Sequence, residues 1–269
     1  MPGFRRTTDY PLFDTHAHYN DHKFDEGGET EGRDSVLEDL FSQNIRHIVN
    51  AGTKPETNLE SIALAEKYPG MYAAVGIHPE DIDTEDDIET VMGELERQLS
   101  HPKVVALGEI GLDYHWDTVP KDTQKIWLRR QLALAEKTGM PVIIHDREAH
   151  ADTFEIVSRY PNLRGVFHCY SGSAEDAVQL AAQGLYIGFG GACTFNGAKR
   201  AAKAIEALPL DAIVLETDCP YMAPEPVRGT RCDSSLICYV GAYIAQRKAL
   251  APEEVFRTTA ANARRVFGL

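Results

Sequence analysis

Phe13-Asp14-Thr15-His16-Ala17-His18 is an apolar residue running into two histidines that alternate around one small residue. On an extended strand, residues two apart point to the same side, so His16 and His18 are expected to face one point. Two imidazoles that converge at a strand end are well suited to a divalent metal. The pair alone is equally compatible with two unrelated surface histidines, so the rest of the chain has to decide.

Short apolar or β-branched runs recur along the whole chain. The eight runs span Leu12–Thr15, His47–Gly52, Met71–Ile77, Val104–Ile110, Val142–His145, Gly165–His168, Tyr186–Gly190 and Ala212–Glu216. Apolar residues at helical spacing lie between most of them, at Thr57–Lys67, Asp86–Leu99, Thr123–Thr138, Ala149–Tyr160 and Ala174–Gln183. Eight strands that alternate with helices predict an α/β fold, a TIM (β/α)8 barrel with right-handed crossovers.

An open doubly wound sheet is the alternative architecture. It would normally carry a glycine-rich phosphate turn after its first strand, where this chain has His16 and His18. Without an internal repeat or a low-complexity linker, we expect one domain over 1–269, with a barrel core from about residue 11 onward. The polar stretch Tyr19–Asp34 is expected to be a mobile loop beside the site. Two helices are expected to close the chain, the last from near Pro252.

Composition narrows the class of protein. The 269 residues are 43% hydrophobic, enough for one large core. The sequence predicts neither a membrane span nor a secretory signal. Cys169, Cys193 and Cys219 are expected to be buried free thiols, which fits a cytoplasmic location. The net charge of −14 argues against tight binding of duplex DNA through many phosphates, but not against an enzyme that holds a phosphate chain end through metals.

Polar residues stand at the ends of most predicted strands, and in such a barrel catalytic residues come from the C-terminal strand ends. The set consists of His16, His18, His78, Glu109, His145, His168, Glu216 and Asp218. One histidine at a strand end is usually structural, but so many at one rim are not expected by chance. Histidine and carboxylate ligands without thiolate suit two divalent ions such as Zn²⁺, Mn²⁺ or Mg²⁺.

The carboxylates are expected to divide the work. Glu109 is midway round the predicted barrel and is the expected bridge between ions about 3.5–4 Å apart. Asp218 is expected to bind one metal and to orient or deprotonate the attacking water. Glu216 shares the strand face of Asp218 and is expected to lie beside the ligands or to contact substrate. The alternative for Glu216 is a buried carboxylate paired to a base.

Several motifs occur in a fixed order along the chain. They are Asp14-Thr15-His16-Ala17-His18, Gly76-Ile77-His78-Pro79, Gly108-Glu109-Ile110-Gly111-Leu112-Asp113, Phe167-His168-Cys169-Tyr170-Ser171-Gly172, Leu215-Glu216-Thr217-Asp218-Cys219-Pro220 and the closing segment 259–269. Together they resemble the signatures of the TatD-type metal-dependent DNases, from Phe13 to Leu269. The resemblance implies a TIM barrel and a divalent-metal phosphodiesterase acting on DNA, typically 3′→5′ on single strands and sometimes on RNA.

The resemblance also implies roles for individual residues. The implied metal ligands are His16, His18, Glu109, His145, His168 and Asp218. It implies His78 as a contact to the scissile phosphate and Glu216 as a further active-site carboxylate. A protonated imidazole at a strand end can hold a phosphate oxygen, whereas the alternative for His78 is a hydrogen bond before a proline turn. The expected partner is a nucleic acid substrate, the ends of single-stranded DNA, with no membrane and no obligate protein partner evident.

One segment departs from the family pattern. The family usually has Arg-Gly-x-Arg-Asn-Glu/Ser-Pro after the eighth strand, whereas this chain has Arg228-Gly229-Thr230-Arg231-Cys232-Asp233-Ser234-Ser235. Arg228 and Arg231 are kept, and we expect them to contact a second phosphate. The missing Asn and Pro put substrate preference or loop rigidity in question.

Two other functions stay open at this point. A small-molecule amidohydrolase or lactonase would use the same metallo-barrel, but such relatives often have a modified lysine at the fourth-strand bridge, where this chain has Glu109. A non-catalytic metal-dependent scaffold is disfavoured by the intact set of ligands, which includes Asp218.

Overall fold

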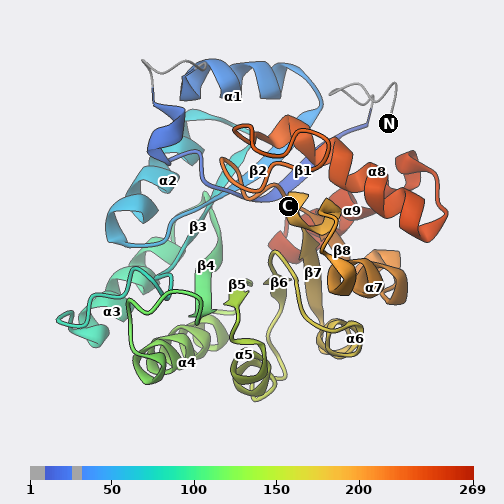
Figure 1. Cartoon of the computed structure of the whole chain (residues 1–269). Helices are drawn as coiled ribbons and strands as arrows, with labels where there is room; N and C mark the ends of the chain where they lie inside the picture. Colours follow the sequence, from blue (N-terminus) through green and yellow to red (C-terminus); the bar gives the residue numbers. More distant parts are fainter. Residues whose placement is uncertain (1–9, 26–31) are drawn as a thin grey trace.

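The structure is a computed structural model that describes residues 10–25 and 32–269. Its centre is a sheet of eight parallel strands in the order of the chain (Figure 1). The strands are β1 (Leu12–Ala17), β2 (Ile45–Ala51), β3 (Met71–Val75), β4 (Val104–Asp113), β5 (Val142–Arg147), β6 (Gly165–Phe167), β7 (Leu185–Phe189) and β8 (Ile213–Leu215). Each strand pairs in parallel with the next, as the alternation of strand and helix predicts.

The first and last strands meet and close the sheet into a TIM barrel. Ala17 forms an isolated parallel bridge with Cys219. The backbone N–H of His18 donates to the carbonyl of Cys219 at 2.7 Å, and that of Asp218 donates to the carbonyl of His16 at 3.0 Å. The predicted barrel is therefore confirmed and the open sheet is not. Closure also brings the two histidines of the first motif beside Asp218, about two hundred residues later in the chain.

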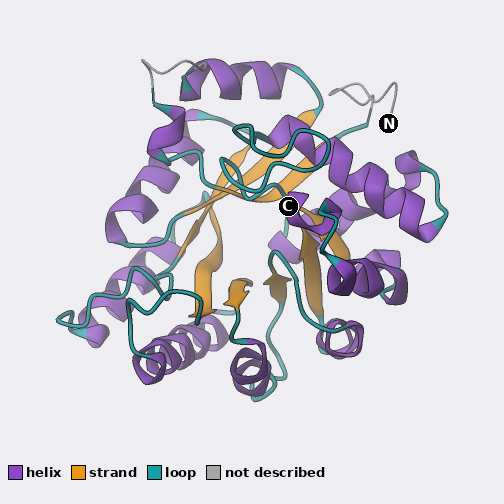
Figure 2. Ribbon diagram, in the orientation of Figure 1, coloured by secondary structure: helices purple, strands orange, loops and turns teal. Residues whose placement is uncertain are grey.

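Helices surround the strands in the described part of the chain (Figure 2). They are α1 (Arg33–Ser42), α2 (Pro55–Lys67), α3 (Ile88–Leu99), α4 (Lys121–Thr138), α5 (His150–Val157), α6 (Ala174–Ala182), α7 (Lys199–Ala207), α8 (Ile237–Lys248) and α9 (Pro252–Phe267). Short 3-10 helices are η1 (His22–Phe24), η2 (Gly191–Thr194), η3 (Leu210–Ala212) and η4 (Ser234–Leu236). All five helices that were predicted between the strands, and the two helices predicted to close the chain, are present.

The last helix closes one end of the barrel. It begins at Pro252, has Glu253 and Glu254 in its first turn, and ends at Phe267, followed by Gly268 in the left-handed conformation. Four of its buried apolar side chains, those of Ala260, Ala263, Val266 and Phe267, share one cluster with side chains from seven of the eight strands. Residues from so many strands can meet only inside the barrel. Phe13, near the start of β1, stacks on Phe267 with ring centroids 5.9 Å apart, so α9 covers the end opposite the strand C-termini.

The segment after β1 corresponds to the loop expected beside the site. Residues 26–31 lie outside the described residues, but Tyr19 and Phe24 are fully buried and their rings pack 4.7 Å apart. Tyr19–Asp25 is a loop with the short η1 turn, and Asn20, Asp21 and His22 line the cavity, so the predicted loop beside the site is present. The two aromatic rings, however, anchor this polar segment in the core. From Arg33 onward the chain is helical, since buried Val36, Leu37 and Leu40 line one face of α1.

Two expectations from composition can be compared with the structure. The five cysteines form no disulfide; four are buried, and Cys169 is partly exposed. Within residues 10–25 and 32–269, no helix is both long enough and apolar enough to cross a bilayer.

Candidate metal centre

Six strands, β1, β3, β4, β5, β6 and β8, deliver imidazoles and carboxylates to one point at their C-terminal ends. His16 lies in β1 and His18 directly after it, and their Nε2 atoms are 2.9 Å apart. Asp218 follows β8, and its Oδ1 lies 3.4 Å from His18 Nε2 and 3.8 Å from His16 Nε2. The same-side placement predicted for the two histidines is present. Asp218 completes this half of the cluster because β8 closes against β1.

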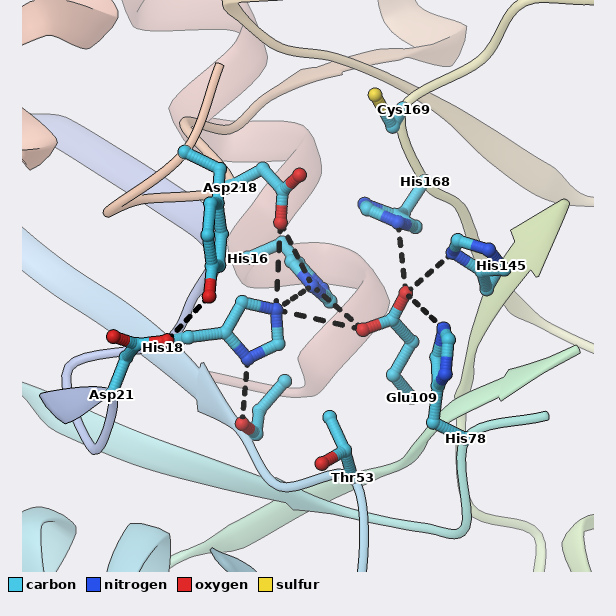
Figure 3. Close-up of polar contacts among 12 residues, drawn as sticks. His16, His18, Asp21, Thr53, His78, Glu109, His145, His168, Cys169 and Asp218 are labelled. Carbon is cyan, nitrogen blue, oxygen red and sulfur yellow. Dashed lines mark hydrogen bonds and ion pairs between the residues drawn. The ribbon is translucent and has the colours of Figure 1, made fainter. Parts of the chain in front are cut away.

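Glu109 of β4 occupies the centre of the cluster (Figure 3). Its Oε2 faces the first half, 3.2 Å from His16 Nε2 and 3.5 Å from His18 Nε2. Its Oε1 faces the second half, 2.8 Å from His145 Nδ1 and 3.0 Å from His168 Nε2. The two oxygens of one carboxylate thus contact two separate sets of imidazoles. This geometry is what a carboxylate needs to bridge two cations.

Close backbone packing sets the position of the second half. A Cβ added to Gly111 of β4 would lie 1.9 Å from the carbonyl oxygen of His145. No larger residue fits there, so glycine lets β4 approach β5 just beyond Glu109. The neighbouring strands then carry Glu109 and His145 toward the same point.

Each imidazole is oriented through its other ring nitrogen or by a neighbour. His18 Nδ1 lies 3.0 Å from the carbonyl of Ala51, which makes Nδ1 the donor and leaves the lone pair of Nε2 directed at the cluster. His145 Nε2 lies 3.0 Å from Asp113 Oδ2 and so directs Nδ1 at Glu109. The ring of His168 stacks on that of His16 with centroids 4.0 Å apart.

Asp113 is a site residue that the sequence interpretation did not assign. It ends β4 and is 1% exposed. Its bond to His145 helps raise the pKa of that imidazole to about 9, outweighing burial, which lowers it. The sequence could have indicated this position, because Asp113 stands four residues after Glu109 on a strand, and residues an even number apart on a strand share a face. A carboxylate behind a histidine is the usual partner that orients a metal ligand.

The electrostatics of the cluster favour an ionised carboxylate, whereas the imidazoles fall into two groups. Burial lowers the pKa of His16 and His78, but the neighbouring carboxylates outweigh burial and raise the pKa of His18, His145 and His168. Burial opposes ionisation of Glu109, but the charges of His168 and His16 outweigh it and hold its pKa well below the usual range. Burial, followed by the nearby His168, lowers the pKa of His16. Metal ions bind carboxylates and neutral imidazoles, so an imidazole that carries a proton on its ligating nitrogen would release it when a metal binds.

The residues present fit divalent cations. Three sets of ligand atoms lie within 4.8 Å of one another: His16, His168 and Asp218; His16, His18 and Glu109; and His78, Glu109 and His145. Imidazole nitrogens and carboxylate oxygens without thiolate favour Zn²⁺, Mn²⁺ or Mg²⁺ over a structural zinc cage. All of these residues are buried or nearly so, and all of them except His16 line a cavity.

His78 lies in the same cluster, just after β3. Its Nε2 is 3.7 Å from Glu109 Oε1, and its Nδ1 accepts a hydrogen bond from the backbone N–H of Glu80 at 3.2 Å. Burial lowers the pKa of His78 to about 3, so the ring is neutral near pH 7. Burial of the site therefore disfavours the protonated form that was expected for this imidazole, and its contact with a phosphate stays a prediction. The neutral ring still carries its proton on Nε2, toward the cavity.

Glu216 lies behind His168 and is fully buried. Its Oε1 is 3.4 Å from His168 Nδ1 and accepts a hydrogen bond from the backbone N–H of Cys169 at 2.5 Å. It does not line the cavity. Of the two expected roles, a position beside the ligands agrees with this geometry better than direct contact with substrate.

Arg228 and Arg231 lie away from the cluster. The guanidinium carbon of Arg228 is 4.0 Å from the ring centroid of Phe195, and that of Arg231 is 4.8 Å from that of Phe24. Arg231 also donates to the carbonyl of Lys23 at 3.0 Å. Neither arginine lines the cavity. A contact between these residues and substrate stays a prediction.

The cluster opens into a cavity of about 1400 Å³. The cavity is lined by most of the metal-centre residues and by residues at or beyond the ends of several strands, including Asp21, Trp116, Arg147, Lys199 and Tyr221. It is larger than the range of about 300–1000 Å³ typical of small-molecule sites. A cavity of this size has room for more than the group that reacts.

A TIM barrel that gathers imidazoles and carboxylates at its C-terminal rim has the architecture of a metal-dependent hydrolase. The family model described as TatD related DNase matches residues 13–268, and the chain belongs to this family.

Relatives of known sequence or structure agree with this assignment. The chain is 40% identical over 261 residues to YabD of Bacillus subtilis (strain 168), named an uncharacterized metal-dependent hydrolase, with 95% of this chain and 98% of YabD covered. The crystal structure of YjjV, a TatD homolog from Escherichia coli K12, matches with a TM-score of 0.86 at 30% identity over 96% of this chain and 98% of YjjV. The 3′-5′ ssDNA/RNA exonuclease TatD of Cronobacter sakazakii is 29% identical, with 87% and 91% covered.

Proposed function

We propose that this chain is a divalent-metal-dependent deoxyribonuclease that removes nucleotides from the 3′ end of single-stranded DNA, with RNA as a second substrate. The observation that carries the proposal is Glu109, whose two oxygens face two separate sets of imidazoles. Support also comes from the exonuclease of Cronobacter sakazakii, which is similar to nearly the whole chain. The large cavity favours the end of a polymer over a small lactone or amide.

Two divalent ions would be held by His16, His18, Glu109 and Asp218 on one side and by Glu109, His145 and His168 on the other. When bound, such ions lower the pKa of water toward about 7 and neutralise charge on a phosphoryl group. Glu109 would contribute one oxygen to each ion. Because its pKa is held low, Glu109 needs no deprotonation before it binds them.

Two further side chains would act on the substrate. The carboxylate of Asp218 faces the cavity and would orient the attacking water and accept its proton at Oδ1. The Nε2–H of His78 would donate a hydrogen bond to an oxygen of the scissile phosphate and stabilise charge that develops there. Glu216 would hold His168 in place through Nδ1.

The arginines of the 228–235 segment are proposed to contact phosphates outside the cavity. Replacing Arg228 and Arg231 together by alanine should raise KM for an oligonucleotide and reduce the salt dependence of binding, because phosphate contacts release counterions. An unchanged KM would mean that the pair only supports Phe195 and Phe24.

The experiment that tests the function uses one single-stranded DNA oligonucleotide carrying a label at the 3′ end in one sample and at the 5′ end in another. With Mg²⁺ or Mn²⁺, the 3′ label should appear first in mononucleotides, while the 5′ label should appear in a ladder of shortening products. EDTA and the Asp218→Asn variant should both abolish release, with the fold retained by circular dichroism. No cleavage by metal-loaded protein, together with turnover of lactone or amide substrates, would favour the small-molecule hydrolase instead.

A further inference from the structure

An exposed indole lies at the rim of the cavity. Trp116, in the loop between β4 and α4, is 49% exposed and lines the cavity that contains the metal centre. Other large apolar side chains with similar exposure, such as Leu59 and Ile126, lie on α2 and α4 and do not line it. A large aromatic side chain that is exposed to water beside a cavity is a candidate surface for ligand binding.

The position of Trp116 is coupled to the metal centre through Asp113. Oδ1 of Asp113 accepts hydrogen bonds from the backbone N–H groups of His115, at 2.8 Å, and Trp116, at 3.3 Å. Oδ2 of the same carboxylate lies 3.0 Å from His145 Nε2. One buried carboxylate therefore anchors both a candidate metal ligand and the loop that carries the indole.

Neighbouring side chains brace the indole and give it a cationic partner. The ring of His115 meets that of Trp116 edge-on, with centroids 4.7 Å apart, and His115 Nδ1 lies 2.8 Å from Glu148 Oε1. The guanidinium carbon of Arg147, at the end of β5, is 5.7 Å from the centroid of the Trp116 ring. Arg147 also lines the cavity. A flat π surface beside a planar cation suits a nucleobase with its attached phosphate.

Tyr221 is a second exposed aromatic residue of the cavity, but its ring and its hydroxyl already have partners. The ammonium of Lys23 lies 3.9 Å from its ring centroid, and its hydroxyl donates to Asp21 Oδ2 at 2.5 Å. Trp116 is therefore the better candidate for stacking.

We propose that Trp116 and Arg147 form a nucleobase-stacking subsite that holds an unpaired base next to the phosphodiester bond to be cleaved. The inference rests on the proposed nuclease function and deepens it. Stacking on an indole requires an exposed base face, which a base inside a duplex does not offer. The subsite thus selects single strands while tolerating every base, since each base has a π face.

Binding can be followed directly because the chain has two tryptophans. The other, Trp127 on α4, is 5% exposed, so a Trp127→Phe variant leaves Trp116 as the single emitter. We would titrate this metal-loaded variant with a phosphorothioate tetrathymidylate, which resists hydrolysis, and with an abasic phosphorothioate chain of equal length. The thymidylate should quench the emission and the abasic chain should not. Equal responses, or no quenching by thymidylate, would overturn the proposal.

Kinetics give the second readout. Trp116→Ala should raise KM for a single-stranded oligonucleotide about tenfold, within the range for loss of one base–aromatic stack, and leave kcat nearly unchanged. Trp116→Phe should recover most of the loss. Ile126→Ala removes a side chain of similar exposure from the following helix and should change neither constant. Unchanged KM in Trp116→Ala would contradict the subsite.

The subsite and the nuclease function fail in different ways. If the protein cleaves no oligonucleotide but thymidylate alone quenches Trp116, the subsite stands and the nuclease function falls. If the protein cleaves single strands normally and neither quenching nor KM depends on Trp116, the nuclease function stands and the subsite falls.

Discussion

Two buried carboxylates of the barrel, Glu109 and Asp14, have opposite surroundings. Glu109 is 4% exposed, faces the cavity and is surrounded by imidazoles (Figure 3). Asp14 is fully buried behind the cluster and is surrounded by donors. Its Oδ2 accepts from the hydroxyls of Ser234 and Thr217, both at 2.6 Å, and its Oδ1 from the backbone N–H of Thr217 at 3.0 Å.

The two environments shift the pKa values of these carboxyl groups in opposite directions. Burial raises the pKa of Asp14 to about 7, and its hydrogen bonds offset only part of that effect. The imidazoles around Glu109 overcome burial and hold its pKa well below the usual value. Burial alone therefore does not identify a functional carboxylate. What distinguishes Glu109 is a set of partners with lone pairs that a cation can use, whereas the partners of Asp14 use their protons to join β1, β8 and η4.

The largest effect is expected from Glu109→Gln, which keeps the size of the side chain and removes its charge. The variant should fold normally, bind metal weakly and lose about 10³-fold in kcat, the upper range for removal of a group that stabilises transition-state charge. Turnover of the labelled oligonucleotide and metal content after dialysis would be measured together. Activity within tenfold of the wild type would mean that Glu109 does not bridge the ions.

Asp113→Asn tests the support behind the same cluster. It weakens the contact that orients His145, so metal affinity or kcat should fall about 10- to 100-fold. Asp117→Asn is a matched control, because Asp117 is an exposed residue of the same loop. If both variants behave like the wild type, the 3.0 Å contact between Asp113 and His145 does not orient the ring.

Ser234→Ala tests the second carboxylate. It removes one donor to Asp14 and the hydroxyl that lies 2.8 Å from Tyr19 Oη. The free energy of unfolding should fall by about 1–3 kcal/mol, the cost of leaving a buried polar group short of a partner, while kcat stays close to that of the wild type. Denaturant unfolding measures the first and the oligonucleotide assay the second. Ser158→Ala, at an exposed serine, is the control. If Ser234→Ala lost activity without losing stability, Asp14 would have a functional role rather than a structural one.

A smaller, pH-dependent effect is expected at an imidazole–carboxylate pair outside the cluster. His150 Nδ1 lies 2.5 Å from Asp146 Oδ2, and this hydrogen bond raises the pKa of His150 above its usual 6.5. The pair therefore stabilises the fold fully below pH 6.5, and the contribution is lost as pH rises through the raised pKa.

His150→Gln should accordingly cost about 1 kcal/mol at pH 6 and less at pH 9. Unfolding at the two pH values measures the difference. His101→Gln, which removes the more exposed contact with Glu66, should show a smaller loss. If His150→Gln lowered the free energy of unfolding equally at both pH values, the charge of His150 would not contribute to stability.

Much of the fold and of the site was predictable because both depend on strand periodicity. His16 and His18 lie two residues apart on a strand, and His145 ends a β-branched run, so their shared rim follows from the barrel. The partners of Asp14 were not predictable, because Ser234 approaches only through tertiary packing. Arg228 and Arg231 show the same limit: their motif is local, but the direction of each long side chain depends on Phe195 and Phe24.

The most direct test of the account is a calorimetric titration of chelator-stripped protein with Mn²⁺. The wild type should bind two ions per chain, and Glu109→Gln should lose tight binding at both positions because one carboxylate serves each. Asp14 contributes no ligand, so Ser234→Ala should still bind two ions. A wild-type stoichiometry of one, or binding by Glu109→Gln equal to that of the wild type, would contradict a two-metal centre bridged by Glu109.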